Sequence, residues 1–153
     1  MEFAAGLKLA GFAVNVGSLI RSALKSAKGH KRKLLLELQD NIELVNLWRQ
    51  KEFPIDRVIL KLSQAHYRAA VAENFSLNSI KSGRLKATTT KGIPQFQKYV
   101  GWTTEAMLDN VYRKIKTLVD IVEMDTDSKK VDKKARLSNL YKLMILLVHH
   151  IDS

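Results

Sequence analysis

Residues 137–151 read LSNLYKLMILLVHHI, and this stretch decides the fold. Between residues 140 and 148 the only charged side chain is Lys142. The apolar positions recur with heptad-like spacing: Leu137, Leu140, Met144, Leu147, Val148 and Ile151. This spacing is typical of an α-helix, and a helix that is apolar around most of its circumference is buried on several sides. Because the apolar run is too short to span a bilayer, we predict a central core helix over about 129–151.

The same period of about 3.6 residues runs through the rest of the chain, and no segment shows the sustained alternation of a strand. Thr103 followed by Glu105 predicts the start of one helix, with Trp102 and Met107 at the positions that fix chain entry. The other predicted helices cover about 3–28, 31–52 and 55 to 75 or 80, and the one after Thr103 runs to about 124. We therefore expect an all-α fold, an antiparallel helical bundle of four to five helices, in a single domain over residues 1–153.

The third predicted helix begins after Pro54, which suits a first helical turn. Its inward positions are expected to be Ile55, Ile59, Leu62, Ala65, Ala69 and Ala72. Residues 76–102, rich in Ser, Thr and Gly, interrupt the helical period and are predicted to form one long basic loop. Within this loop, residues 94–100 predict a short helix that buries Phe96, Tyr99 and Val100.

The chain carries a net charge of +11, and the excess is concentrated in two segments. Residues 1–36 hold seven bases and one acid, and residues 74–104 hold five bases and no acid. Concentrated positive charge favours phosphate-bearing partners such as nucleic acid or anionic lipid. The alternative is that both segments are simply solvated surface.

The sequence carries no motif that is typical of an active site or a metal centre. It has no cysteine, and none of its four histidines stands at the Glu-x-x-His or His-Glu-x-x-His spacing of metal-binding helices. His149 and His150 are adjacent, so we expect them at a frayed helix end, and we expect His66 to be packed or half-exposed. The sequence predicts a non-enzymatic protein with no catalytic residue, no metal, no cofactor and no small-molecule substrate.

The first predicted helix is unusually apolar, because Lys8 is the only charged residue between positions 3 and 20. A helix of this kind is either buried on nearly every side or made for lipid. In the second case the membrane-contacting residues are Phe3, Leu7, Leu9, Phe12, Val14, Val16, Leu19 and Ile20. The residues that follow form a basic sector suited to an anionic surface: Arg21, Lys25, Lys28, Lys31, Arg32 and Lys33.

This helix also resembles a known family. Ala4-Ala5-Gly6-Leu7, then Ala10-Gly11-Phe12-Ala13-Val14 and Gly17, resemble the opening helix of HeLo-like domains. The resemblance covers the first helix only. It implies a relationship to the helical-bundle executioners of cell death, whose N-terminal helix inserts into membranes or lies on them. Pore formation would then also require oligomerisation.

Three functions remain open at this point. The first is a non-enzymatic bundle that binds or perturbs anionic membranes through its N-terminal helix and the basic sector, as a cell-death or defence effector. The second is a nucleic-acid or polyanion binder that uses the basic loop, with Tyr99 and Trp102 available to stack on bases. The bases of this second site are Lys81, Arg84, Lys86, Lys91 and Lys98, extended by Lys129, Lys130, Lys133 and Lys134.

The third function is a protein-interaction or self-assembling module in which the chain forms homo-oligomers. In all three cases the sequence shows no secretory signal, so we expect an intracellular (cytoplasmic) protein, recruited to a membrane in the first case.

Overall fold

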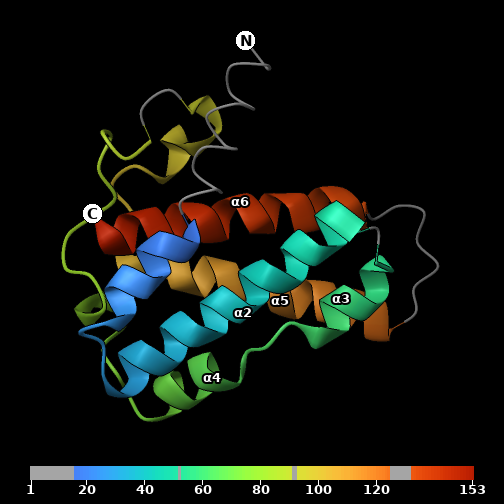
Figure 1. The fold of residues 1–153 in the computed structure, drawn as a ribbon, viewed down its shortest axis with the longest axis horizontal. Helices are drawn as coiled ribbons and strands as arrows, with labels where there is room; N and C mark the ends of the chain where they lie inside the picture. Colours follow the sequence, from blue (N-terminus) through green and yellow to red (C-terminus); the bar gives the residue numbers. More distant parts are fainter. Residues whose placement is uncertain (1–15, 52, 91–92, 125–131) are drawn as a thin grey trace.

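The computed structural model describes residues 16–51, 53–90, 93–124 and 132–153 (Figure 1). These residues form six α-helical segments and two short 3₁₀ helices, with no β-strand among them. The all-α helical bundle predicted from the sequence is confirmed. After a helical segment over residues 16–24, the elements are α2 (Gly29–Lys51), α3 (Ile55–Lys61), α4 (Ala65–Ala72), η1 (Leu77–Ser79), η2 (Pro94–Tyr99), α5 (Thr104–Glu123) and α6 (Lys133–Asp152).

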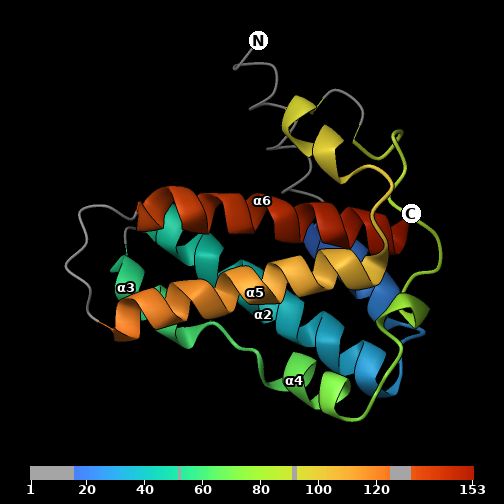
Figure 2. The same ribbon diagram turned by 180° about the vertical axis from the view of Figure 1, so that it is seen from behind.

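Helix α6 lies at the centre of the bundle, as its apolar sequence predicts. It runs antiparallel to α5 and also packs against α2 and α3 (Figures 1 and 2). Every residue from 140 to 148 except Lys142 is buried. The helix begins at Lys133, with the side chain of Asp132 accepting a hydrogen bond from the backbone N of Ala135 at 2.9 Å. The residues just before it, 125–131, lie outside the described part of the chain.

Helix α5 follows the sequence prediction closely. Thr103 is its N-cap, and its hydroxyl oxygen accepts a hydrogen bond from the backbone N of Ala106 at 3.1 Å. A hydroxyl in this position satisfies an N–H group that would otherwise lack a helical partner. The apolar face that this helix turns to the core comprises Met107, Leu108, Val111, Tyr112, Ile115 and Leu118.

The prediction of one long helix after Pro54 is wrong, because the chain breaks between α3 and α4. Leu62 is extended, and the backbone N of Ser63 donates to Oδ1 of Asn41 at 2.8 Å while its carbonyl accepts from Nδ2 at 2.9 Å. The buried Asn41 amide is thereby satisfied by a backbone that has left the helix. The register changes as a result. Ala70 is buried, and the three alanines expected to point inward are exposed: Ala65, Ala69 and Ala72.

Residues 76–102 are not one polar loop, so this prediction is also wrong. The segment is tied back on itself, because the backbone N of Leu85 donates to the carbonyl of Trp102 at 2.9 Å and the backbone N of Gly101 donates to the carbonyl of Leu85 at 2.9 Å. It buries apolar side chains at Leu77, Ile80, Leu85, Ile93, Phe96 and Tyr99. The predicted short helix is present as η2, beside α6 in both views (Figures 1 and 2), although Val100 is only half-buried.

Two histidine predictions are also corrected. His150 is not at a frayed end: it is 2% exposed, and its Nε2 lies 2.8 Å from Oγ1 of Thr104. His66 is exposed near the start of α4 rather than packed or half-exposed, a consequence of the break at Ser63.

Candidate anion-binding groove

Two adjoining hollows lie between α5, α6 and η2. The first has a volume of about 240 Å³ and is lined by Asn110, Arg113, Lys114, Thr117, Leu118, Arg136 and Asn139. The second has a volume of about 130 Å³ and is lined by Gln95, Phe96, Lys98, Tyr99, Lys114, Asn139, Lys142 and Leu143. Lys114 and Asn139 line both hollows. We therefore treat the two as one feature, the α5–α6 groove.

Helical register explains why these side chains gather here. On α5 the contributing positions are 110, 113, 114 and 117, which fall on one face because their spacing is three, four and seven residues. On α6 the positions 136, 139 and 142 or 143 have the same kind of spacing. The two helices are antiparallel neighbours (Figure 2), and residues of both polar stripes line the same groove. Lys98 joins them from η2.

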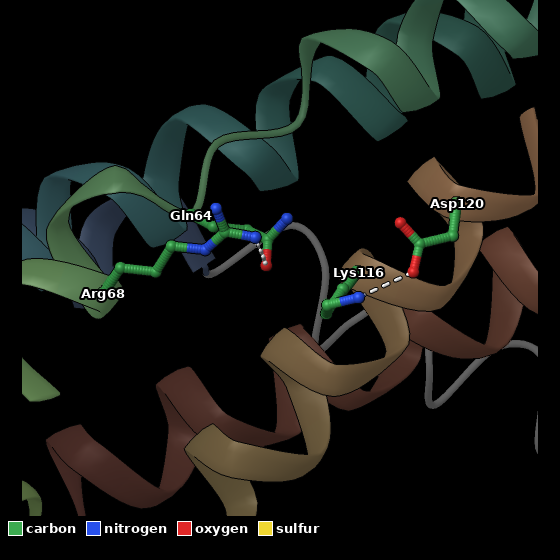
Figure 3. Close-up of polar contacts among 4 residues, drawn as sticks. All are labelled: Gln64, Arg68, Lys116 and Asp120. Carbon is green, nitrogen blue, oxygen red and sulfur yellow. Dashed lines mark hydrogen bonds and ion pairs between the residues drawn. The ribbon is translucent and has the colours of Figure 1, made fainter. Parts of the chain in front are cut away.

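Among the described residues no acidic side chain lines the groove, whereas five cations do: Lys98, Arg113, Lys114, Arg136 and Lys142. Within the described ranges, none of these five forms an ion pair with a carboxylate. Lys116, only two residues from Lys114, is different, because its Nζ lies 2.7 Å from Oδ2 of Asp120 on the next turn of α5 (Figure 3). Arg68 on α4 likewise turns to a near neighbour in the chain, donating to Oε1 of Gln64, the N-cap residue of α4, at 3.4 Å (Figure 3).

The electrostatics of Lys114 reflect this crowding. Partial burial, followed by repulsion from Lys98, Arg136 and Arg113, lowers the pKa of its ammonium below the usual value. Like charges held close to a partly desolvated ammonium favour its uncharged form. A bound anion would relieve the repulsion, so the groove is electrostatically complementary to negative charge.

The side chains of the groove are suited to binding an anion. Arg113 and Arg136 bring guanidinium groups, whose paired donors match the oxygens of a phosphate, while the lysines act as point charges. The amide side chains of Asn110 and Asn139 supply both donors and acceptors. Of the residues that the structure describes, no histidine or carboxylate lines either hollow. Across the described part of the chain, no cluster of three or more His, Cys, Asp or Glu residues could hold a metal ion.

The structure separates the bases that the sequence grouped into one loop site. Lys98 lines the groove, but Lys81 donates to the carbonyl of Ser153 and Arg84 donates to the carbonyl of Gly101 at 2.9 Å. Lys81 and Lys86 both act electrostatically on His150, near the C-terminal end of α6. Lys133 pairs with Asp56 at 2.6 Å. Lys134 lies in the first turn of α6, at the opposite end of that helix from Lys81 and Lys86. The remaining three, Lys91, Lys129 and Lys130, lie outside the described residues.

The two aromatic residues proposed for base stacking are engaged within the fold. Tyr99 is only 9% exposed, its ring lies edge-on to the ring of Trp102 with 5.0 Å between centroids, and Lys98 Nζ lies 5.1 Å from its centroid. Trp102 is half-buried against the core. The structure therefore presents neither ring as an open stacking surface.

The N-terminal helix is described only from residue 16. Val16 and Ile20 are 3% and 1% exposed, and Leu19 is partly buried against the core. Five of the predicted membrane-contacting residues lie outside the described residues: Phe3, Leu7, Leu9, Phe12 and Val14. The predicted basic sector is at the surface, with Lys31 half-buried and the others exposed: Arg21, Lys25, Lys28, Arg32 and Lys33. No helix in the described part of the chain is both long enough and apolar enough to cross a membrane.

Only one of the five groove cations, Lys98, was predicted from the sequence. The apolar stripes of α5 and α6 were used to predict the core, and the polar faces of the two helices were not considered as a binding site. A signal was available. Asn110, Arg113, Lys114 and Thr117 form an acid-free stripe at helical spacing, and Arg136, Asn139 and Lys142 form another. What the sequence does not contain is the pairing of these two stripes across one helix interface.

Comparison with known proteins adds no assignment. No protein-family model matches the chain, and no significant match is found among curated proteins or solved structures.

Proposed function

We propose that this domain binds the phosphate backbone of nucleic acid through the α5–α6 groove. The observation that carries the proposal is the set of five cations that line two adjoining hollows with no carboxylate among the lining residues. Proteins that contact nucleic-acid backbones present lysine and arginine side chains with accompanying amide and hydroxyl donors, which is the composition found here.

The arrangement favours a chain of phosphates over a single phosphate. Cations from three elements are spread over both hollows, and only Lys114 and Asn139 are common to the two. One phosphate could neutralise one hollow, whereas consecutive phosphates of a strand would neutralise both. The net charge of +11 adds a long-range attraction that speeds the approach of any polyanion.

Membrane binding through the N-terminal helix stays a prediction. Its described residues Val16 and Ile20 are buried, so a membrane could reach them only after the helix had left the core. The exposed basic sector could meet a flat anionic bilayer without that change. The sector and the groove are different surfaces, and this makes the two functions separable by mutation.

The test is a titration of a fluorescently labelled 20-nucleotide single-stranded RNA, and of a DNA duplex of the same length, at low salt. We expect the double variant Arg113→Glu/Arg136→Glu to weaken binding at least about tenfold, since a hydrogen bond to a charged group such as a phosphate is worth roughly 1.5–3 kcal/mol. The matched control is Arg21→Glu/Lys25→Glu, which makes the same change in net charge on the exposed basic sector. It should change the affinity less than threefold, an effect of general charge only.

Two outcomes contradict the proposal. Equal losses in the groove variant and the control would mean that binding follows total charge and not the groove. Absence of nucleic-acid binding, combined with binding to phosphatidylserine vesicles that only the basic-sector control abolishes, would favour the membrane function instead.

A further inference from the structure

A second surface lies where the end of α2, the start of α3 and the start of α6 meet (right side of Figure 1). There an open hollow of about 500 Å³ is lined by Trp48, Arg49, Phe53, Ile55 and Lys134. We call it the Trp48 hollow. It shares no lining residue with the α5–α6 groove.

The apolar side chains of this hollow are more exposed than those of the core. Phe53 is 48% exposed, and Trp48 and Ile55 are only partly buried against the core. Large apolar side chains grouped at a concave surface are typical of places where another molecule binds. Trp and Arg are also the residues that most often dominate the binding energy of protein interfaces.

The two cations of the hollow, Arg49 and Lys134, differ from the neighbouring Lys133 in their partners. The guanidinium carbon of Arg49 lies 4.4 Å from the centroid of the Tyr141 ring, and this cation–π contact holds the side chain in place. Lys133 is neutralised by Asp56, with 2.6 Å between Nζ and Oδ1. Lys134 is exposed and has no ion-pair partner among the residues that the structure describes. Among the described residues, the hollow therefore combines three apolar side chains, those of Trp48, Phe53 and Ile55, with the cations Arg49 and Lys134.

Charge complementarity selects the occupant. We propose that the Trp48 hollow docks a short segment of a partner protein in which apolar side chains alternate with acidic ones. The apolar side chains would cover Trp48 and Phe53, and the carboxylates would face Arg49 and Lys134. A second copy of this chain is disfavoured, because it would bring the same two cations against themselves in a protein of net charge +11. A fatty acid fits less well, since an open hollow gives a long acyl chain no enclosed channel.

The experiment starts from a displayed library of random 12-residue peptides, selected against the full chain. We expect the selected peptides to combine Leu, Phe or Trp with Asp or Glu. A labelled synthetic copy of the most enriched peptide should then bind at least about tenfold more weakly to Phe53→Ser and to Lys134→Glu, as expected when an anchoring contact is lost.

Matched controls exist for both changes. Leu60→Ser removes an apolar residue of similar exposure (49%) from α3 outside the hollow, and Lys25→Glu reverses an exposed charge elsewhere. Both should bind the peptide as the unmodified chain does, and so should the groove variant Arg113→Glu/Arg136→Glu. All the substituted hollow and control side chains are exposed, so we expect every variant to keep the fold. Thermal unfolding of each variant checks this.

Three results would overturn the proposal. The first is a selection that enriches no acidic, apolar sequence over a selection against Phe53→Ser. The second is a peptide whose binding is unaffected by Phe53→Ser and Lys134→Glu. The third is displacement of the peptide by sodium oleate at concentrations below those needed to form micelles, since this would identify a fatty acid as the better occupant.

Discussion

Nε2 of His150 lies 2.8 Å from Oγ1 of Thr104 in the interior of the protein, and the same hydroxyl donates its hydrogen to the carbonyl of Lys81 at 2.6 Å. Because that hydrogen is already used, the threonine oxygen can only accept from the imidazole. This geometry assigns the Nε2–H form to the neutral ring. The last turn of α6 is thereby joined to the first turn of α5 by a buried polar link.

This link predicts a loss of stability in mild acid. Burial, and then the nearby Lys81 and Lys86, lower the pKa of His150 below its usual value. The folded state therefore binds this proton less readily than the unfolded state, so the stabilising contribution is complete above the unfolded pKa of about 6.5 and is lost as the pH falls below it. We expect the free energy of unfolding in urea to fall between pH 7.5 and pH 5.5. The fall should be smaller in His150→Asn, and an equal fall in both proteins would contradict the assignment to His150.

Glu37 predicts a second measurable effect. This carboxylate is 2% exposed, and it accepts hydrogen bonds from the hydroxyl of Ser63 and the backbone N of His66, both at 2.8 Å, and from the backbone N of Tyr67 at 3.1 Å. It thus caps α4 from a different helix, in place of a residue of α4 itself.

Glu37→Ala removes a buried carboxylate that accepts three hydrogen bonds and leaves two part-buried backbone donors of α4 without their acceptor, so we expect a loss of about 2–4 kcal/mol in the free energy of unfolding. Chemical denaturation provides the measurement. Glu43→Ala, at an exposed position on the same helix, should change the stability by less than about 0.5 kcal/mol. If the two alanine variants were equally stable, Glu37 would not be holding α4 in place.

The N-terminal helix allows a third prediction, about the resting state of the protein. Ile20 is 1% exposed, so Ile20→Ala should cost about 2–5 kcal/mol of stability through lost burial and the cavity left behind. Ser18→Ala, an exposed position on the same helical segment, should be close to neutral. A stability unaffected by Ile20→Ala would mean that this segment is not part of the core in solution, which is the condition that membrane insertion needs.

Features that depend on residues close together in the sequence were predictable, and features that depend on residues far apart in the sequence were not. The central helix and the Thr103 cap were predictable, because an apolar run and a capping residue act within a few positions along the chain. The break at Ser63 was not, since it depends on Asn41 and Glu37, which lie more than twenty residues away in the sequence. The α5–α6 groove, like the break at Ser63, depends on residues that are far apart in the sequence. Each helix carries a readable polar stripe, but the site exists only where two helices bring their stripes together.

The most direct test of the central claim is the dependence of nucleic-acid affinity on salt. For single strands, the logarithm of the association constant falls with the logarithm of salt concentration by roughly 0.7 for each phosphate contact. We predict that Arg113→Gln/Arg136→Gln reduces this slope by about 1.4, the value for two lost contacts, while Arg21→Gln/Lys25→Gln leaves it unchanged. A slope that is the same in the groove variant and the unmodified chain would contradict the claim that these two arginines hold phosphate.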